Sequence, residues 1–360
     1  MTPRERVRRA VRFEGPDRVP IRYYNLPGAY DRLGEALLEL YRRYPPDWPL
    51  PRRLEHSWET SHYAVGSETD EWGCVWENVG HGVEGQVKVH PLADWSRFED
   101  YVPPDPRLNV DRPWGSRRPA EWDDYFVILR AGGGRLFERM HFLRGYEELM
   151  ADIALERDRV LQLRDLVLEH TLAQLSEQLE VDVDAFWFMD DWGAQRQLMI
   201  RPDVWRDVFK PAYKQIFDRI HAAGKFVLFH SDGYIAEIIP DLLELGVDIF
   251  NPQFSCFRFD ELAELCAGKV CVQSDVDRQY LLPLGKPEEI WEYVWQVIWT
   301  FGRDGGGLIA HAEFGPDVPL KNVEAVLKAF HTLAPYPLRY VPYGANGLAM
   351  CGAARARNVS

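Results

Sequence analysis

The chain has 360 residues, of which 46% are hydrophobic, and this is enough to bury one large core. Its formal net charge of -14 argues against nucleic acids and anionic membranes as partners, because both are themselves negatively charged. No run of apolar residues reaches the ~18 that a transmembrane helix needs.

The N-terminus predicts a helix rather than a targeting segment. No apolar stretch follows the pair Arg8 and Arg9, so we expect no signal peptide. Thr2 is a suitable helix cap, Pro3 suits the first helical position, and Glu5 completes a capping box. The five cysteines include no close pair, and their number is odd, so free thiols in a reducing cytoplasm are the simplest interpretation.

The first part of the chain is less regular than the second. Residues 17–25 pass from apolar to polar and predict the first strand of a sheet. Residues 69–92 alternate apolar and polar positions with glycines at the turns, which predicts a β-hairpin. The stretch 101–119 is rich in proline and predicts an extended loop. Residues 125–134 predict a strand followed by a glycine turn.

Five short apolar runs in the second half end in polar residues. They lie at 185–193, 225–233, 247–254, 269–277 and 307–315, and longer stretches with helical periodicity separate them. Strands that alternate with amphipathic helices predict a parallel sheet, and in a (β/α)8 barrel the C-terminal strand ends meet at one pocket. The polar residues at these ends are Asp190, Asp191, His230, Asp232, Asn251, Gln253, Asp275, His311 and Glu313.

This pattern predicts an α/β protein with one TIM-barrel domain over residues 1–340. An N-terminal helical and β-hairpin extension would lie over the barrel mouth, with 69–92 as a lid, and 341–360 would form a tail. So many polar residues at one end favour an enzyme over a packing scaffold.

Structural roles compete with catalytic ones at several of these positions. One carboxylate of the pair Asp190 and Asp191 could cap the following helix, and we expect Asp190 to face the pocket and Asp191 to cap. Asp275 could likewise cap a helix that starts near Arg278. His230 could be a buried histidine bonded to a carbonyl group, although its place directly after a strand favours a site role.

Several segments resemble the uroporphyrinogen decarboxylase superfamily, in the same order along nearly the whole chain. They are MTPRERVRRAVRFEGPDRVPI, TDEWGCVWENVGHGVEGQ, FMDDWGAQRQLMI, GKFVLFHSDGYIAEIIPDLLELGVDIFNPQ, SDVDRQYLLPLGKPEEI and DVPLKNVEAVLKAF. The resemblance implies a (β/α)8 barrel with its pocket at the C-terminal strand ends. It leaves two activities open, which are tetrapyrrole decarboxylation and zinc-dependent methyl transfer with corrinoid proteins.

Departures from the family pattern favour the methyltransferase branch. The decarboxylases of this superfamily carry Arg-Gln-Ala-Gly-Arg after the first strand. At that place this chain has the nearly uncharged YYNLPGAYDRLG at 23–34. The region after the last strand, HAEFGPDVP at 311–319, also lacks the decarboxylases' Gly-His pair. An acidic chain is in addition a poor trap for a substrate with eight carboxylates.

The methyltransferases of this superfamily bind zinc through a His-x-Cys motif after the fifth strand and a cysteine after the eighth strand. Here the first motif reads His230-Ser231-Asp232, and Glu313 stands near the second position, so carboxylates replace both thiolates. The resemblance therefore implies a divalent metal held by His230, Asp232, His311 and Glu313. Zinc is the favoured ion, and the oxygen ligands leave manganese or iron open.

The remaining predicted roles complete a methyl-transfer hypothesis. With 13 Trp, 16 Tyr and 18 Phe, an aromatic pocket would suit an aryl methyl ether or a methylammonium compound. No Asp-x-His-x-x-Gly corrinoid signature occurs, so a corrinoid would arrive on a separate protein. The predicted catalytic residues are Asp190, Asp275 and Tyr24, and the predicted substrate contacts are Tyr23, Trp187, Trp192, Asn251 and Gln253.

The sequence leaves two alternative functions and the oligomeric state open. The chain could decarboxylate uroporphyrinogen or another carboxylate without a metal. It could also be a ligand-binding barrel that has lost its chemistry, because both thiolates and the decarboxylase arginines are missing. The chain could also form a homodimer.

Overall fold

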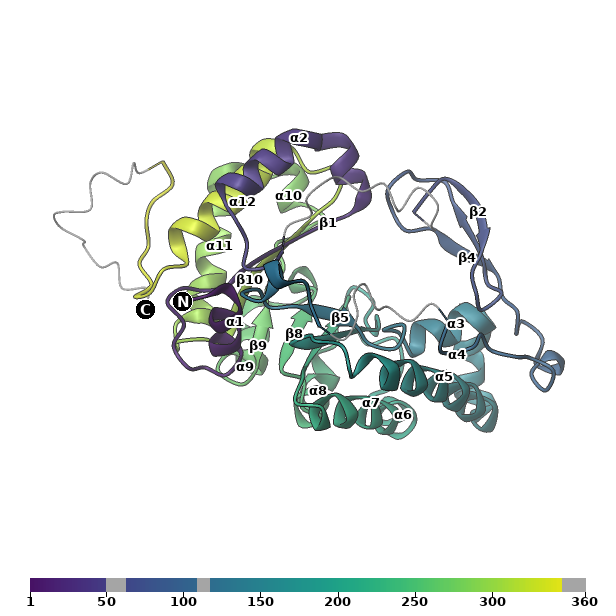
Figure 1. Cartoon of the computed structure of the whole chain (residues 1–360). Coiled ribbons are helices and arrows are strands. Elements are labelled where there is room, and N and C mark those ends of the chain that lie inside the picture. The colour runs from purple at the N-terminus through teal and green to yellow at the C-terminus, as the bar shows by residue number, and fades with distance from the viewer. Residues whose placement is uncertain (50–62, 109–116, 345–360) are drawn as a thin grey trace.

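The computed structural model describes residues 1–49, 63–108 and 117–344. Its centre is a curled parallel sheet of seven strands, in the order β1-β10-β9-β8-β7-β6-β5 (Figure 1). The strands are β1 (Ile21–Asn25), β5 (Ile128–Arg130), β6 (Ala185–Met189), β7 (Phe226–Ser231), β8 (Ile249–Pro252), β9 (Cys271–Gln273) and β10 (Leu308–Phe314).

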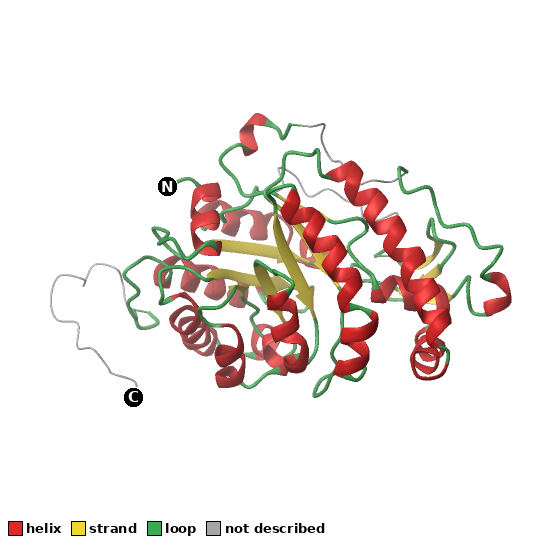
Figure 2. Ribbon diagram, turned by 90° about the horizontal axis from the view of Figure 1, so that it is seen from below, coloured by secondary structure: helices red, strands yellow, loops and turns green. Residues whose placement is uncertain are grey.

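Helices surround this sheet on its outer side (Figure 2). The helices α2, α11 and α12 lie beside β1 and β10, whereas α7 packs on β7 and is itself contacted by α5 and α6 (Figure 1). The helices are α1 (Pro3–Val11), α2 (Pro27–Arg43), α3 (Phe137–Arg144), α4 (Tyr146–Leu155), α5 (Arg157–Gln178), α6 (Pro202–Val208), α7 (Lys210–Ala222), α8 (Ile239–Glu244), α9 (Phe259–Cys266), α10 (Leu281–Leu284), α11 (Pro287–Gly302) and α12 (Leu320–Leu333). Among them we find none whose length and hydrophobicity would suit a bilayer-spanning segment.

The α/β class and the parallel sheet are confirmed, whereas the closed eight-stranded barrel is not seen. The described residues form seven parallel strands, and β1 and β5 are the two edges of their sheet. Between these strands the chain builds α2 and a separate antiparallel sheet of β2 (Gly66–Thr69), β3 (Val75–Asn78) and β4 (Gln86–Val89). No described segment therefore fills the place of an eighth strand between β1 and β5.

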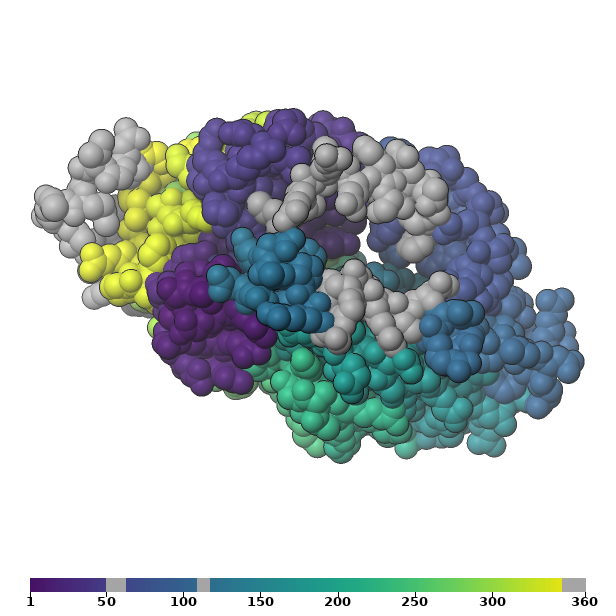
Figure 3. Space-filling model, viewed as in Figure 1, coloured from purple at the N-terminus to yellow at the C-terminus, as the bar shows by residue number. Residues whose placement is uncertain are grey.

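The antiparallel sheet and its turns connect the start of α2 with α3, the helices that follow the two edge strands. On the α3 side, the Cys74 thiol donates to the Phe142 carbonyl oxygen (3.3 Å), and the Trp76 and Phe142 rings meet edge to face. On the α2 side, the Gly28 N–H donates to the Gly82 carbonyl (3.0 Å). A Cβ on Gly82 would lie 2.3 Å from the Gly28 backbone, so this contact requires glycine. The molecule is hollowed between α2 and the antiparallel sheet (Figure 3).

The helix ends follow from capping residues, proline and glycine in the sequence. The Thr2 hydroxyl accepts the Glu5 N–H (3.2 Å) at the start of α1. The amphipathic segment 201–224 forms two helices, α6 and α7, which meet just before Pro211, and Gly224 follows with φ +69°.

One buried carboxylate, Asp184, holds α1 and the segment before β5 against the N-terminal end of the sheet. Its Oδ1 accepts from the Nε atoms of Arg4 (2.8 Å) and Arg8 (3.0 Å) on α1. Its Oδ2 accepts from Nη1 of Arg118 (3.0 Å) and from the N–H of Val127 (3.1 Å). The side chains of Asp184 and Arg118 are both fully buried. This carboxylate therefore joins α1, the segment before β5, and the start of β6.

We predict that Asp184→Ala destabilises the protein by about 3–5 kcal/mol, because it leaves the buried Arg118 guanidinium without its fully buried counterion. Asp218→Ala is the control, since Asp218 forms an exposed pair with Lys214 and its loss should change stability by only about 0.5 kcal/mol. Denaturant unfolding measures both free energies. Equal stabilities of the two variants would contradict this role of Asp184.

Candidate metal centre at the strand ends

Alternate side chains on each strand face the inside of the curled sheet. Near the N-terminal strand ends this inner face is apolar and is closed by Val7 and Val11 of α1; it consists of Ala185, Leu228, Ile249, Cys271 and Ile309. Two and four residues further along β7, β8, β9 and β10, the same face becomes polar, whereas on β6 these positions are Trp187 and Met189. The polar positions hold His230 and Asp232, Asn251 and Gln253, Gln273 and Asp275, and His311 and Glu313, together with Arg22 and Tyr24 on β1. The C-terminal strand ends therefore carry a polar inner face, which we call the chamber.

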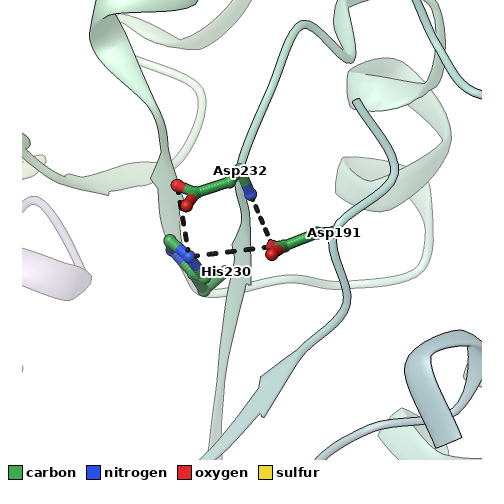
Figure 4. Close-up of side chains that lie close together, drawn as sticks. All are labelled: Asp191, His230 and Asp232. Carbon is green, nitrogen blue, oxygen red and sulfur yellow. Dashed lines mark hydrogen bonds and ion pairs between the residues drawn. The ribbon is translucent and has the colours of Figure 1, made fainter. Parts of the chain in front are cut away.

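Three side chains in this chamber converge on one point, as Figure 4 shows. Nε2 of His230 lies 3.5 Å from Oδ1 of Asp232 and 3.9 Å from Oδ1 of Asp191. The Asp232 N–H donates to Oδ1 of Asp191 (2.8 Å). The three potential ligand atoms all lie within 4.8 Å of one another, so a single metal ion could contact all three.

The orientation of His230 fits a metal ligand. Its Nδ1 lies 2.9 Å from Oδ1 and 3.0 Å from the carbonyl oxygen of Asn251, and both atoms are acceptors. Nδ1 therefore carries the proton, and the lone pair of Nε2 points toward the two carboxylates. Metal-bound histidines are commonly held by such a second hydrogen bond. One imidazole and two carboxylates suit zinc, manganese or iron and leave positions open for a substrate.

Two glycines hold the loops that carry this cluster. A Cβ on Gly193 would lie 2.4 Å from the Gly233 carbonyl carbon, and one on Gly233 would lie 1.9 Å from the Gly193 oxygen. Gly233 also has φ +80°, and the Gly193 N–H donates to the Asp232 carbonyl (3.2 Å). The loops after β6 and β7 can therefore touch only because neither residue has a side chain.

Arg278 neutralises the acidic side of the chamber. Its Nη2 donates to Oδ1 of Asp232 (2.6 Å), and its Nη1 donates to Oε1 of Glu313 (3.0 Å). Its Nε lies 3.6 Å from Oδ1 of Asp275. Burial alone would lower the pKa of Arg278, but the three carboxylates outweigh it and raise that pKa.

Asp275 is a buried acid beside this cluster. Among the described residues, its Oδ2 has no hydrogen-bond partner. Burial raises the pKa of Asp275 to about 7, with the charges of Asp232 and Glu313 adding to the rise and Arg278 opposing it. A large fraction of Asp275 is therefore protonated at neutral pH. Burial and the charge of Asp232 also raise the pKa of Asp191.

Of the four predicted metal ligands, His230 and Asp232 lie in the cluster and the other two do not. Glu313 faces Arg278 instead. The Nδ1 of His311 donates to the Ser274 carbonyl (3.0 Å), and burial lowers the pKa of this histidine well below its usual value. Asp191 takes the third place in the cluster.

The predicted roles of Asp190 and Asp191 are reversed in the structure. The Asp190 carboxylate is completely buried and points to the start of α3, not into the chamber. It accepts the backbone N–H groups of Leu136 (2.9 Å), Phe137 (3.1 Å) and Glu138 (2.9 Å), and the Tyr213 hydroxyl (2.7 Å). The expectation that Asp190 faces the pocket is wrong because the free N–H groups of α3 bind this carboxylate.

Two predicted substrate contacts face the helices instead of the chamber. Trp192 is fully buried, stacks on Phe137 with ring centroids 4.1 Å apart, and donates to the Tyr213 hydroxyl (2.8 Å). Tyr23 stacks on Tyr41 (5.0 Å), and its hydroxyl donates to the Tyr44 carbonyl (3.1 Å). Their aromatic surface packs between sheet and helices, which corrects the prediction for both.

The other predicted contacts lie at the chamber. Trp187 and Tyr24 are partly buried at inward positions of β6 and β1. Asn251 orients His230, and Oε1 of Gln253 accepts the Gly233 N–H (2.8 Å). Both amides therefore support the loops that carry the metal cluster.

Sequence reasoning missed Asp191 and Arg278 as site residues. Asp191 is two residues beyond the inward position Met189 and four beyond Trp187, so continued alternation along β6 would have placed it inside. Arg278 stands three residues after Asp275, close to the start of a predicted helix, and its i,i+3 spacing was the available signal.

Comparisons with known proteins agree with this architecture. A uroporphyrinogen decarboxylase from Legionella pneumophila (strain Paris) is 25% identical over 219 residues, and the match spans 59% of this chain but only 57% of that relative. The enzyme of the same name from strain Lens is 24% identical over the same length. A methyltransferase from Methanosarcina mazei superposes with a TM-score of 0.64 at 15% identity, covering 92% of this chain and 99% of the other. The family model for uroporphyrinogen decarboxylase (URO-D) matches residues 137–333, more than half of the sequence, and the chain belongs to that family.

Proposed function

We propose that this protein is a metal-dependent methyltransferase that moves a methyl group from a small methylated substrate to a corrinoid carried by a separate protein. The observation that carries the proposal is the cluster of Asp191, His230 and Asp232, with the buried acid Asp275 next to Arg278. The methyltransferase from Methanosarcina mazei, with the same fold, supports it.

The chain's own residues supply proton transfer and charge balance. When bound, a divalent metal would act as a Lewis acid on the heteroatom that bears the methyl group. As the bond from that heteroatom to the methyl carbon breaks, its electron pair stays on the heteroatom, and the methyl group passes to the reduced corrinoid. Protonated Asp275 donates its proton to the leaving heteroatom as a general acid. Arg278 holds the carboxylates of Asp232 and Glu313 in place through its two hydrogen bonds.

Decarboxylation is the competing activity, because the curated relatives carry that name. The residues after β1 do not favour it. Arg32, the one arginine in 23–34, donates to the Pro316 carbonyl and is exposed, so it does not present a fixed cation to the chamber. Carbon dioxide release therefore serves as the contrary outcome in the activity test below.

We predict that zinc, manganese or iron binds to protein purified without chelator and that Asp191→Asn weakens this binding strongly. The loss should exceed the roughly 10- to 100-fold effect of removing an outer-shell partner, because Asp191 is a direct ligand here. Glu313→Gln is the matched control and should change metal affinity much less, since Glu313 faces Arg278. Metal titration followed by calorimetry measures both constants.

A larger loss in Glu313→Gln than in Asp191→Asn would support the ligand set expected from the sequence and contradict the one in the structure. A wild-type protein that binds none of the three metals would contradict the metal centre altogether.

We predict that the metal-loaded protein methylates reduced corrinoid from at least one member of a panel of aryl methyl ethers and methylamines. His230→Ala should lower this rate by at least ~100-fold, because it removes the imidazole ligand. The surface variant Asp218→Ala should keep the wild-type rate. Release of carbon dioxide from a porphyrinogen, with no methylated corrinoid formed, would reverse the assignment.

We predict that Asp275 makes the stability of chelator-treated protein depend on pH. Its pKa is 3.8 in the unfolded chain and about 7 in the folded one, so the folded state binds the extra proton between these values. The unfolding free energy should therefore fall as pH rises from about 4 to 7. Asp275→Asn should flatten this part of the curve, measured by denaturant unfolding at several pH values. An unchanged slope in Asp275→Asn would show that other groups cause it.

A further inference from the structure

Two arginines lie at the seam of the parallel sheet, the gap between its unpaired edge strands β1 and β5. Neither arginine has a carboxylate partner among the described residues. Arg22 lies on β1 and Arg130 on β5, the two edge strands that are not paired with each other. The other two arginines of the chamber region differ, because Arg278 pairs with three carboxylates and Arg135 pairs with Glu84 and Glu138.

Arg22 and Arg130 both belong to the inner face. Arg22 is opposite His311 in the β1–β10 register, two residues before Tyr24. Arg130 is opposite Trp187 in the β5–β6 register, and its guanidinium lies over the Trp187 ring at 5.7 Å. Burial raises the pKa of Tyr24, while the charges of Arg130 and Arg22 both lower it, so both cations act on this one hydroxyl.

Each arginine is held in place but keeps donors free. The Arg22 guanidinium donates from Nη1 to Oε1 of Gln273 (2.7 Å) and lies over Trp48 at 5.6 Å. Burial lowers the pKa of Arg22 to about 10, so it remains charged at neutral pH. A Cβ on Gly134 would lie 2.5 Å from Cγ of Arg130, so the glycine turn after β5 leaves space for that side chain. A guanidinium has five N–H donors, and most of these remain available for an anion.

We propose that Arg22 and Arg130 form a binding site for the carboxylate of a small substrate, whose opposite end reaches Asp191, His230 and Asp232. This inference rests on the proposed function and names its substrate class, a methylated compound that also carries one carboxylate. The planar fork of each arginine matches a carboxylate. Four acids at the same strand ends, Asp191, Asp232, Asp275 and Glu313, disfavour a dianion such as phosphate.

The chamber thereby has two chemically different ends. The seam between β1 and β5 offers positive charge, and the ends of β6 and β7 offer the metal ligands. Trp187 on β6 lies between them and gives an aromatic wall on which a planar substrate body can pack.

The test is calorimetric binding to chelator-treated protein, in which no methyl transfer can occur. The probes are acetate, benzoate, 4-methoxybenzoate, the uncharged 4-methoxybenzamide, and inorganic phosphate. We expect the wild type to bind at least one of the carboxylates and to bind 4-methoxybenzoate at least 10-fold more tightly than the amide. Arg22→Gln and Arg130→Gln should each weaken carboxylate binding by about 10-fold or more.

Arg130 is exposed, so Arg130→Gln should fold even if Arg22→Gln does not. Arg201→Gln is the matched control, because Arg201 is exposed and pairs with Asp203. No binding of any carboxylate, equal binding of acid and amide, or wild-type affinity in Arg130→Gln would each overturn the proposal. Arginine-dependent binding of phosphate alone would overturn the carboxylate class. Since no metal is present, a positive result stands even if methyl transfer is not found.

Discussion

The site depends on a hydrogen-bonded carboxylate that takes no part in its chemistry. Asp190 accepts three backbone N–H groups at the start of α3 and the Tyr213 hydroxyl, so the chain direction after β6 is fixed. Burial raises the pKa of Asp190 to about 6, while these hydrogen bonds lower it. Because Asp190 points outward to α3, the next residue must point inward, and Asp191 meets His230. The same bonds place α3, and with it Arg135 and Glu138, beside the chamber.

Much of this architecture was predictable from the sequence, because strands and helices are encoded locally. The runs ending at Asp190, His230 and Asn251 became parallel strands, and their order along the chain is their order in the sheet. The side-chain roles were less predictable where two neighbours compete. Asp190 and Asp191 have the same chemistry, and what distinguishes them is a helix start more than 50 residues earlier.

The ligand set shows a second limit of sequence reasoning. The resemblance placed Glu313 where a thiolate would stand, but it carried no information about Arg278, whose guanidinium binds both Glu313 and Asp232. Such a cation is invisible without the fold, because it comes from the loop after β9 while its partners follow β7 and lie on β10. The alternating pattern at 69–92 predicted a β-hairpin, and the structure forms three antiparallel strands between residues 66 and 89 in a sheet of their own.

Arg278 links the metal centre to the acid. Nη2 of Arg278 already donates to Oδ1 of Asp232, the oxygen nearest to His230. A metal ion at the cluster would bind the same carboxylate. A metal at the cluster would add positive charge beside Asp232 and weaken the hold of Arg278 on that oxygen. The guanidinium also lies 3.6 Å from Asp275, so one side chain contacts both the candidate metal ligand Asp232 and the buried acid. Arg278 thereby sets the position of Asp275 relative to the cluster of Asp191, His230 and Asp232.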